Sequence, residues 1–290
     1  EELATELLIS DIVVDAVFGT GLSSEVRGFY REAIEIMNES SLPVLSVDIP
    51  SGVNGDNGIV MGVAVDADLT VSFGLPKCGN LLYPGYALGG DLFVSHISFP
   101  PALSKEETIT LEINEPCFLP WRKEDGHKSS FGEVLFAAGA AGYLGAPCFA
   151  ALSFLKAGGG YARLATTEDV VGILGSGGSE IVFHPQPAGP EKSLDLQCLD
   201  QLLEIASAAD MVVAGPGLSL ATGAQDLVRA LSAAVDKPLL LDGDGLTAIS
   251  QSSDSIAARE ETTILTPHPG EMARLSGKSI AEIREDPVDL

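Results

Sequence analysis

Basic residues are scarce in this chain. Its 290 residues include 16 Lys and Arg against 41 Asp and Glu, which gives a formal net charge of -25. A surface with this charge repels nucleic acid and anionic membranes, because phosphate groups are bound mainly by neutralising them with Lys and Arg. We therefore expect no nucleic acid and no membrane among its partners.

Cysteines and long apolar runs are also few. The four cysteines, Cys78, Cys117, Cys148 and Cys198, match no metal-binding or redox spacing, so we expect free thiols in a reducing compartment. No apolar run approaches the length of a membrane span, and the acidic start lacks the basic region of a signal peptide. A cytoplasmic location is the simplest expectation.

Short apolar runs, each followed by small or ionisable residues, recur along the chain. There are three clear cases. The run 211–214 precedes Gly215-Pro-Gly217, the run 238–241 precedes Asp242-Gly-Asp-Gly245, and the run 263–265 precedes residues 266–271. Runs without alternation are typical of strands buried on both faces of a parallel sheet, with helices as the crossovers. Ligands of such sheets bind beyond the carboxyl ends of the strands, so these clusters are candidates for a phosphate or ribose site.

The same periodicity indicates an α/β protein with two domains. A proline-rich, mixed-charge stretch, residues 100–130, separates two series of elements. We expect domains at residues 1–105 and 106–290. The expected strands are 11–18, 42–48, 67–73, 91–97, 132–139 and 161–165 together with the three above, and the expected helices are 31–38, 145–156 and 199–207.

In the first half, Gly19-Thr-Gly21 follows a strand, where it forms either a ligand loop or a tight turn. Asp15 lies in the first apolar run and Asp48 ends the second, so pairing of these strands would bring two carboxylates to one crevice. A buried Asp is rare unless it is paired, hydrogen-bonded or bound to a cation. The alternative is that each Asp caps a turn. We predict that His96 is a strand-face residue.

In the second half, Asp242 and Asp244 either order a polar ligand or cap the following turn. His268 stands between two prolines at a strand end, which favours a ligand contact over a place in the core. Glu271 is a weaker candidate, because a carboxylate at a helix start also complements the helix dipole. We interpret Gly158-Gly-Gly160 as a helix stop.

Residues 14–22, 46–54 and 67–77 together resemble the NAD(P)H-hydrate epimerase domain, which is Rossmann-like. The resemblance implies epimerisation at C6 of the hydrated cofactor NAD(P)HX, a K+ ion held by Asp15 and Ser51, and a substrate contact by Asp48. One departure is the absence from residues 1–10 of the family's Asn-Asn-Gly-Gly-Asp-Gly loop, which supplies another potassium ligand. The resemblance also places a substrate-binding loop at Gly19, Thr20, Gly21, Leu22, Ser23, Ser24 and Glu25.

The second half resembles the NAD(P)H-hydrate dehydratase family, which has a ribokinase-like fold. This resemblance implies that ADP or ATP, with Mg2+, phosphorylates the C6 hydroxyl of NAD(P)HX, after which phosphate leaves and NAD(P)H is restored. It implies substrate contacts by Ala146, Gly217 and His268, with Asp242 and Asp244 as further candidates. The matching runs are His127-Lys128, Phe131-Gly132, 145–147, 155–158, 214–218, 241–246 and 264–272.

Three departures qualify this resemblance. Gly243 stands where the family usually has Ala, and Ser219 where Gly is common. The sequence given also stops at Leu290, before the family's Gly-Ser-Gly-Asp motif, whose Asp deprotonates the hydroxyl. We therefore assign no catalytic residue within the chain and expect the piece alone to be inactive.

Our interpretation is a bifunctional NAD(P)H-hydrate repair enzyme cut at both ends, with two partial three-layer α/β/α domains. The alternatives are a non-catalytic nucleotide-cofactor binding module and another ribokinase-like small-molecule kinase. The choices of ADP against ATP and of NADHX against NADPHX stay open, and a homo-oligomer is compatible with the sequence.

Overall fold

The computed structural model describes residues 2–103, 106, 108–114, 119, 121–122, 124–177 and 180–288. It divides into two compact units, Glu1–Phe118 with Glu285–Leu290, and Leu119–Arg284. Each unit has its own sheet, and every strand pair in both sheets is parallel. The parallel α/β class expected from the apolar runs is confirmed.

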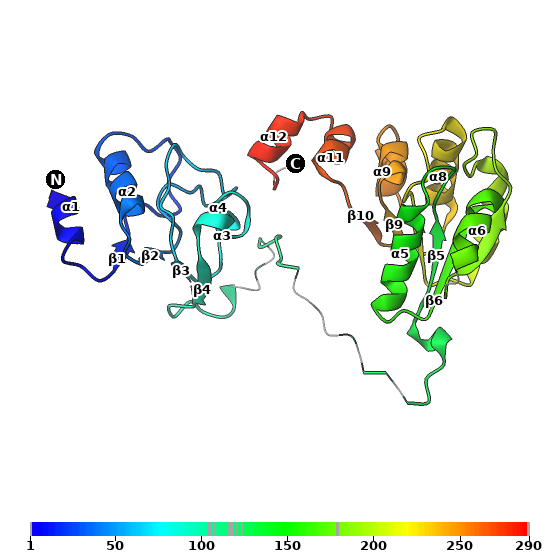
Figure 1. Cartoon of the computed structure of the whole chain (residues 1–290), viewed down its shortest axis with the longest axis horizontal. Helices are drawn as coiled ribbons and strands as arrows, with labels where there is room; N and C mark the ends of the chain where they lie inside the picture. The colour runs from blue at the N-terminus through cyan, green and yellow to red at the C-terminus, as the bar shows by residue number, and fades with distance from the viewer. Residues whose placement is uncertain are drawn as a thin grey trace. The chain divides into compact units, whose positions relative to one another are not determined.

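The first unit contains a four-stranded sheet in the order β1-β2-β3-β4 (Figure 1). Its elements are α1 (Glu2–Leu7), β1 (Val13–Asp15), α2 (Phe29–Glu39), β2 (Val44–Val47), β3 (Leu69–Phe73), α3 (Cys78–Leu81), α4 (Gly85–Leu88) and β4 (Asp91–Ser95).

Helix α2 covers one face of this sheet. Its buried residues Ile34 and Met37 pack with Val13 of β1 and Val44 of β2. On the opposite face Val14 and Phe93 are each 58% exposed. Among the described residues, helices therefore cover the first sheet on one side.

The second half contains a six-stranded sheet in the order β10-β9-β8-β5-β6-β7. Its elements are η2 (Lys128–Phe131), β5 (Glu133–Ala137), α5 (Gly145–Lys156), β6 (Tyr161–Thr167), α6 (Glu168–Leu174), η3 (Gly175–Gly177), β7 (Val182–Gln186), η4 (Leu196–Cys198), α7 (Leu199–Ser207), β8 (Met211–Ala214), α8 (Thr222–Ala234), β9 (Leu239–Leu241), α9 (Asp244–Ile249), α10 (Ser253–Ala257), β10 (Thr263–Leu265), α11 (Pro269–Ser276) and α12 (Ile280–Glu285).

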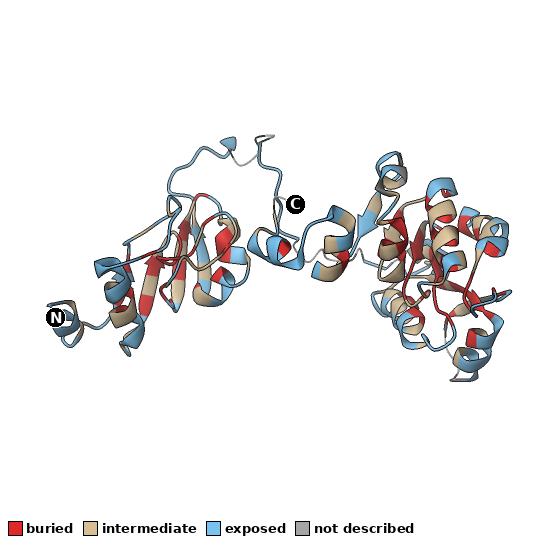
Figure 2. Ribbon diagram, turned by 90° about the horizontal axis from the view of Figure 1, so that it is seen from above, coloured by how far each residue is buried: buried red, intermediate tan, exposed pale blue. Residues whose placement is uncertain are grey.

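The second sheet is buried on both faces. Along β5, Leu135 belongs to a core with Leu202 of α7 and Leu227 of α8, while Phe136 belongs to a second core with Ala151 of α5. Figure 2 shows buried residues in the strands and in parts of the helices, with exposed residues on the outer sides of the helices. Each fully buried Leu contributes about 1.5–3 kcal/mol, so the two cores hold the three layers together.

Strands β1 and β7 differ from expectation for local reasons. Strand β1 stops at Asp15, three residues earlier than predicted, because the carboxylate accepts the Val17 N–H and turns the chain. Strand β7 and helix α6 were not predicted. Strand β7 contains Pro185, which argues against a central strand, but β7 lies at the sheet edge, where Pro is tolerated.

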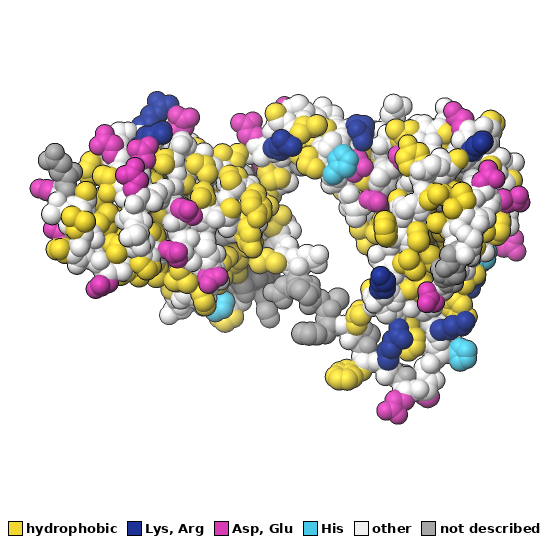
Figure 3. All heavy atoms as spheres, viewed as in Figure 1, with side chains coloured by type: hydrophobic (Ala, Val, Ile, Leu, Met, Phe, Trp, Pro, Cys, Tyr) yellow, Lys and Arg dark blue, Asp and Glu magenta, His cyan; other side chains and the backbone are white. Residues whose placement is uncertain are grey.

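The described residues include no helix with the length and apolarity needed to cross a bilayer. Cys78, Cys148 and Cys198 are free thiols, as expected, and Cys117 lies outside the described residues. Acidic side chains are spread over the visible face of both units (Figure 3).

Candidate functional sites at the carboxyl ends of the strands

Asp15 is fully buried at the end of β1. Its Oδ2 accepts hydrogen bonds from Ser46 Oγ of β2 and from the Ser51 N–H, both at 2.8 Å. Parallel pairing of β1 with β2 places Asp15 opposite Ser46, which explains the first of these bonds. The structure thus brings Asp15 and Ser51 into direct contact.

Ser51 also links this carboxylate to the glycine loop. The Phe18 N–H donates to Ser51 Oγ at 2.8 Å, and the same hydroxyl donates to Phe18 O at 3.2 Å. Phe18 is the last residue before Gly19. Of the loop residues, Leu22 is half-buried, and Gly19, Thr20, Gly21, Ser23, Ser24 and Glu25 are exposed. The loop is therefore anchored at its start and open to solvent, as a ligand loop requires.

The donor set around Asp15 fits a hard monovalent cation. A buried carboxylate needs a compensating positive charge or strong hydrogen bonds. Within the described part of the chain, Asp15 forms no ion pair. The described residues also contain no group of three or more His, Cys, Asp or Glu side chains that could hold a metal ion by themselves. Carboxylate and hydroxyl oxygens are the ligand types that such an ion prefers.

Asp48 follows β2 and is held by a different set of partners. It adopts a left-handed backbone, with φ at 72°, and its Oδ1 accepts the Phe73 N–H at 2.9 Å. Lys77 forms an ion pair with the same oxygen. We assigned no role to Lys77 from the sequence. The sequence feature that could have indicated a role for Lys77 is its place in a Gly- and Pro-rich loop after a strand, in a chain with few basic residues.

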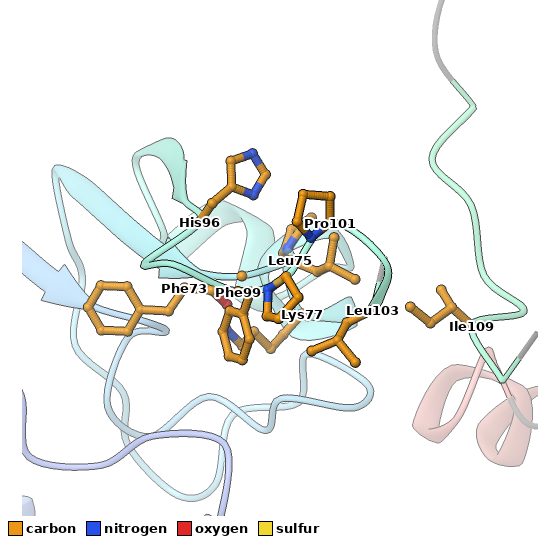
Figure 4. Close-up of a pocket in the computed structure, with 11 residues that line it drawn as sticks. Phe73, Leu75, Lys77, His96, Phe99, Pro101, Leu103 and Ile109 are labelled. Carbon is orange, nitrogen blue, oxygen red and sulfur yellow. The ribbon is translucent and has the colours of Figure 1, made fainter. Parts of the chain in front are cut away.

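Lys77 also lines a cavity of about 640 Å3 in the first unit. The walls are largely apolar and include Leu75, Phe99 and Leu103 (Figure 4). His96 lies at the rim of this cavity, directly after the end of β4, so the expected strand was too long by two residues and His96 is not on a strand face.

In the second unit, strands β10, β9, β8 and β5 are neighbours, so the loops after them meet at one edge of the sheet. Gly217, after β8, has φ at 60°, and a Cβ at this position would lie 3.3 Å from Ala146 Cβ at the start of α5. Gly215 is more crowded, since its Cβ would lie 2.0 Å from Asp242 O. The structure thus brings Gly217 and Ala146 together.

Asp242 and Asp244 connect loops to one another. Asp242 Oδ1 accepts the Thr266 hydroxyl at 2.7 Å, and Asp244 Oδ2 accepts the Ser219 N–H at 2.8 Å. Neither carboxylate caps helix α9, whose N-cap residue is Gly243. Both have a second oxygen through which a ligand could be bound, so their role as ligand contacts stays a prediction.

His268 is the N-cap residue of α11. Its Nδ1 accepts the N–H groups of Gly270 at 3.0 Å and Glu271 at 3.3 Å, and Glu271 Oε2 accepts the His268 N–H at 3.0 Å. The His268 side chain is 65% exposed, so it does not fill the core. The sequence did not predict the capping role, because His is an uncommon N-cap residue. Since α11 packs against α9, His268 belongs to the same edge as the Asp242 loop.

Gly158 to Gly160 form a helix stop, as interpreted from the sequence. Helix α5 ends at Lys156, and the Gly160 N–H donates to the carbonyls of Phe131 and Gly132, so this N–H is not free to bind a phosphate.

Parallel sheets with glycine-rich loops at the carboxyl ends of their strands are typical of α/β proteins that bind nucleotide-like ligands. Comparison with known families gives two matches. Residues 1–79 match the family described as YjeF-related protein N-terminus, and residues 134–288 match the family described as NAD(P)H-hydrate dehydratase. The second match covers more than half of the chain, so the chain belongs to the NAD(P)H-hydrate dehydratase family.

Similar proteins are named as bifunctional enzymes. The chain is 50% identical over 289 residues to the bifunctional NAD(P)H-hydrate repair enzyme Nnr of Thermofilum pendens, which covers 100% of the chain and 55% of that relative. The enzyme of the same name from Moorella thermoacetica is 37% identical over 98% of the chain and 54% of its own length. The chain thus spans about half the length of these curated relatives.

Among solved structures, the ADP/ATP-dependent NAD(P)H-hydrate dehydratase from Bacillus subtilis, co-crystallised with ATP and Mg2+, is 26% identical. The match has a TM-score of 0.46 and covers 58% of this chain and 55% of that one.

Proposed function

We propose that the protein carrying this chain repairs hydrated NADH and NADPH. Residues 1–105 form the epimerase domain, which equilibrates the two C6 epimers of NAD(P)HX. Residues 106–290 belong to the dehydratase domain, which restores NAD(P)H with ADP or ATP. The order of the two matched families along the chain, and the names of the relatives that contain both, support this assignment.

In the epimerase half, Asp15 and Ser51 would hold K+, which supplies a fixed positive charge next to the substrate. The Asp15 carboxylate supports this role, because it is fully buried and its partners among the described residues are three hydrogen-bond donors without a positive charge. The exposed loop, Gly19 to Glu25, binds the cofactor, because its open backbone allows a ligand phosphate to approach closely. Asp48 contacts the substrate with the oxygen that Lys77 leaves free.

In the dehydratase half, Ala146, Gly217 and His268 bind the hydrated nicotinamide. A nucleotide, with Mg2+, supplies the phosphoryl group that turns a poor leaving group, hydroxide, into a good one. The single observation that carries this proposal is the close approach of Gly217 to Ala146, since a Cβ added to Gly217 would lie 3.3 Å from Ala146 Cβ. Both residues are small, which allows the loops after β5 and β8 to meet closely at this edge of the sheet.

The test is recovery of NADH from its hydrate by the complete gene product. We expect recovery with ADP or ATP and none without a nucleotide. With K+ replaced by Li+, the epimer that the dehydratase accepts should be consumed as before, and conversion of the other epimer should slow. Failure to recover NADH with either nucleotide refutes the proposed function.

The 290-residue piece expressed alone provides a second test. We expect it to give no turnover, because the chain contains no residue to which we assign the proton transfer. Turnover by the piece would refute this part of the proposal and would place the general base among residues 1–290.

A further inference from the structure

The two carboxylate oxygens of Asp48 differ in their partners. Oδ1 accepts the Phe73 N–H at 2.9 Å and the Ser72 hydroxyl at 3.5 Å, and it pairs with the Lys77 ammonium. Oδ2 has no hydrogen-bond partner among the described residues. The side chain is 21% exposed, so Oδ2 can be reached from solvent. One oxygen is therefore fixed and the other is available.

Lys77 uses all three of its ammonium hydrogens within the protein. Besides Asp48, it donates to Ser72 Oγ at 3.1 Å and to Phe73 O at 2.9 Å. An ammonium has three donors and no acceptor, so Lys77 has no hydrogen left for a ligand. Its side chain is 19% exposed, so most of the lysine surface is covered by the protein.

Asn80 links the backbone of Lys77 to that of Asp48. The backbone N–H of Lys77 donates to Asn80 Oδ1 at 2.9 Å, and Asn80 Nδ2 donates to the backbone carbonyl of Asp48 at 3.4 Å. Lys77 also lines the apolar cavity of Figure 4, whereas Asp48 is not among the residues that line it. The lysine stem thus packs in this cavity while its ammonium is turned to Asp48.

We infer that Lys77 is a positioning residue for the epimerase reaction: it fixes Asp48 so that Oδ2 points to the substrate. This inference rests on the proposed function, because it takes Asp48 as a substrate contact. Without Lys77, Oδ1 of Asp48 would keep the Phe73 N–H and the long contact with Ser72, and the carboxylate could still turn about these bonds and attract water. The ion pair prevents both, so the free oxygen is preorganised to accept a hydrogen bond from the substrate.

The test compares four variants of the complete gene product: Lys77→Met, Lys77→Arg, Asp48→Asn and the double variant Lys77→Met with Asp48→Asn. The matched control is Arg31→Met, which removes a cation from the exposed Arg31–Glu35 pair of α2. The measured quantities are kcat and KM for epimerisation, with the dehydratase activity of the same polypeptide as an internal reference.

We expect Lys77→Met to raise KM for epimerisation by about ten- to hundredfold, as for loss of a hydrogen bond to a charged group. A merely structural role lowers the active fraction instead, and so lowers kcat at constant KM. Because Lys77 acts through Asp48, the double variant should be no worse than Asp48→Asn. Lys77→Arg keeps the charge and should lie between Lys77→Met and the wild type.

Losses that multiply in the double variant overturn the inference, as does a Lys77→Met enzyme with the KM of Arg31→Met. If Lys77→Met does not fold, Lys77→Arg decides: an unchanged KM refutes the role, and a raised KM supports it. Failure of the wild type to epimerise refutes the proposed function instead, so the two failures are distinguishable.

Discussion

Replacement of Gly217 by Ala tests the candidate dehydratase site directly. The backbone of Gly217 has φ at 60°, and an added Cβ would lie 3.0 Å from Tyr143 Cβ and 3.3 Å from Ala146 Cβ. A non-glycine residue in the left-handed region costs about 1–2 kcal/mol. The two close contacts add to this cost, because the loop after β5 must move by a few tenths of an ångström.

For a domain of roughly 150–250 residues, each kcal/mol shifts Tm by about 2–4 °C, so the backbone term alone lowers Tm by about 2–8 °C. The methyl group would also push the loop after β8 away from the loop after β5, at the edge where we place the hydrated nicotinamide. We therefore expect a raised KM for NAD(P)HX in the dehydratase reaction. Thermal denaturation and steady-state kinetics on the same preparation measure the two effects.

Gly277→Ala is the matched control. Gly277 ends α11 with φ at 73°, and a Cβ there would meet nothing within 4 Å. This variant carries the backbone cost without the contacts, so it should lose less stability than Gly217→Ala and keep the wild-type KM. Equal melting temperatures and equal KM values for the two variants would refute the reasoning.

Three further predictions concern single residues. Asp15→Ala should destabilise the first unit by about 2–6 kcal/mol in chemical denaturation, because it leaves two buried donors unpaired at about 1–3 kcal/mol each. Asp15→Asn keeps an acceptor, so an equal loss of stability in that variant would contradict the explanation. Ser219 has φ at 80°, so Ser219→Gly should be more stable than Ser219→Ala by about 1–2 kcal/mol, and the reverse order of Tm values counts against strain at this position. Burial lowers the pKa of His184, so the unfolded chain takes up a proton first as the pH falls below about 6.5, and stability falls with it. Thermal melting at decreasing pH should show a smaller fall in Tm for His184→Gln than for the wild type. An equal fall in Tm would show that other groups cause the pH dependence.

The sequence predicted the strands and helices that have strong local signals. The apolar runs at 211–214 and 263–265 are β8 and β10, and the helical segments predicted at 145–156 and 199–207 are α5 and α7. Their ends are marked by glycine, proline or a change to polar residues, and these signals act within a few residues. Strand β7 lacks such a signal, because its Pro185 is acceptable only at a sheet edge, and the position of a strand in the sheet is not a local property.

For the first site, only the family resemblance implied that Asp15 and Ser51 lie together. The rarity of an unpaired buried Asp indicated that Asp15 has a partner but did not identify it. Lys77 was missed, because its partner Asp48 lies 29 residues away and the ion pair depends on how the loops after β2 and β3 meet. Neither propensity nor periodicity contains that information.

The loops of the second site show why residue type alone could not separate ligand contacts from structural ones. Asp242 and Asp244 were equally compatible with a ligand and with a turn, and the structure shows each tied to a neighbouring loop. The Gly139 N–H likewise donates to Pro216 O at 3.0 Å, so the loops after β5, β8, β9 and β10 are linked in series. A ligand that enters this edge meets loops whose entropy of ordering is already lost on folding. The small residues and carboxylates at these strand ends therefore hold the loop framework together, and we expect a substitution that breaks one tie, such as Thr266→Val, to weaken substrate binding without removing a substrate contact.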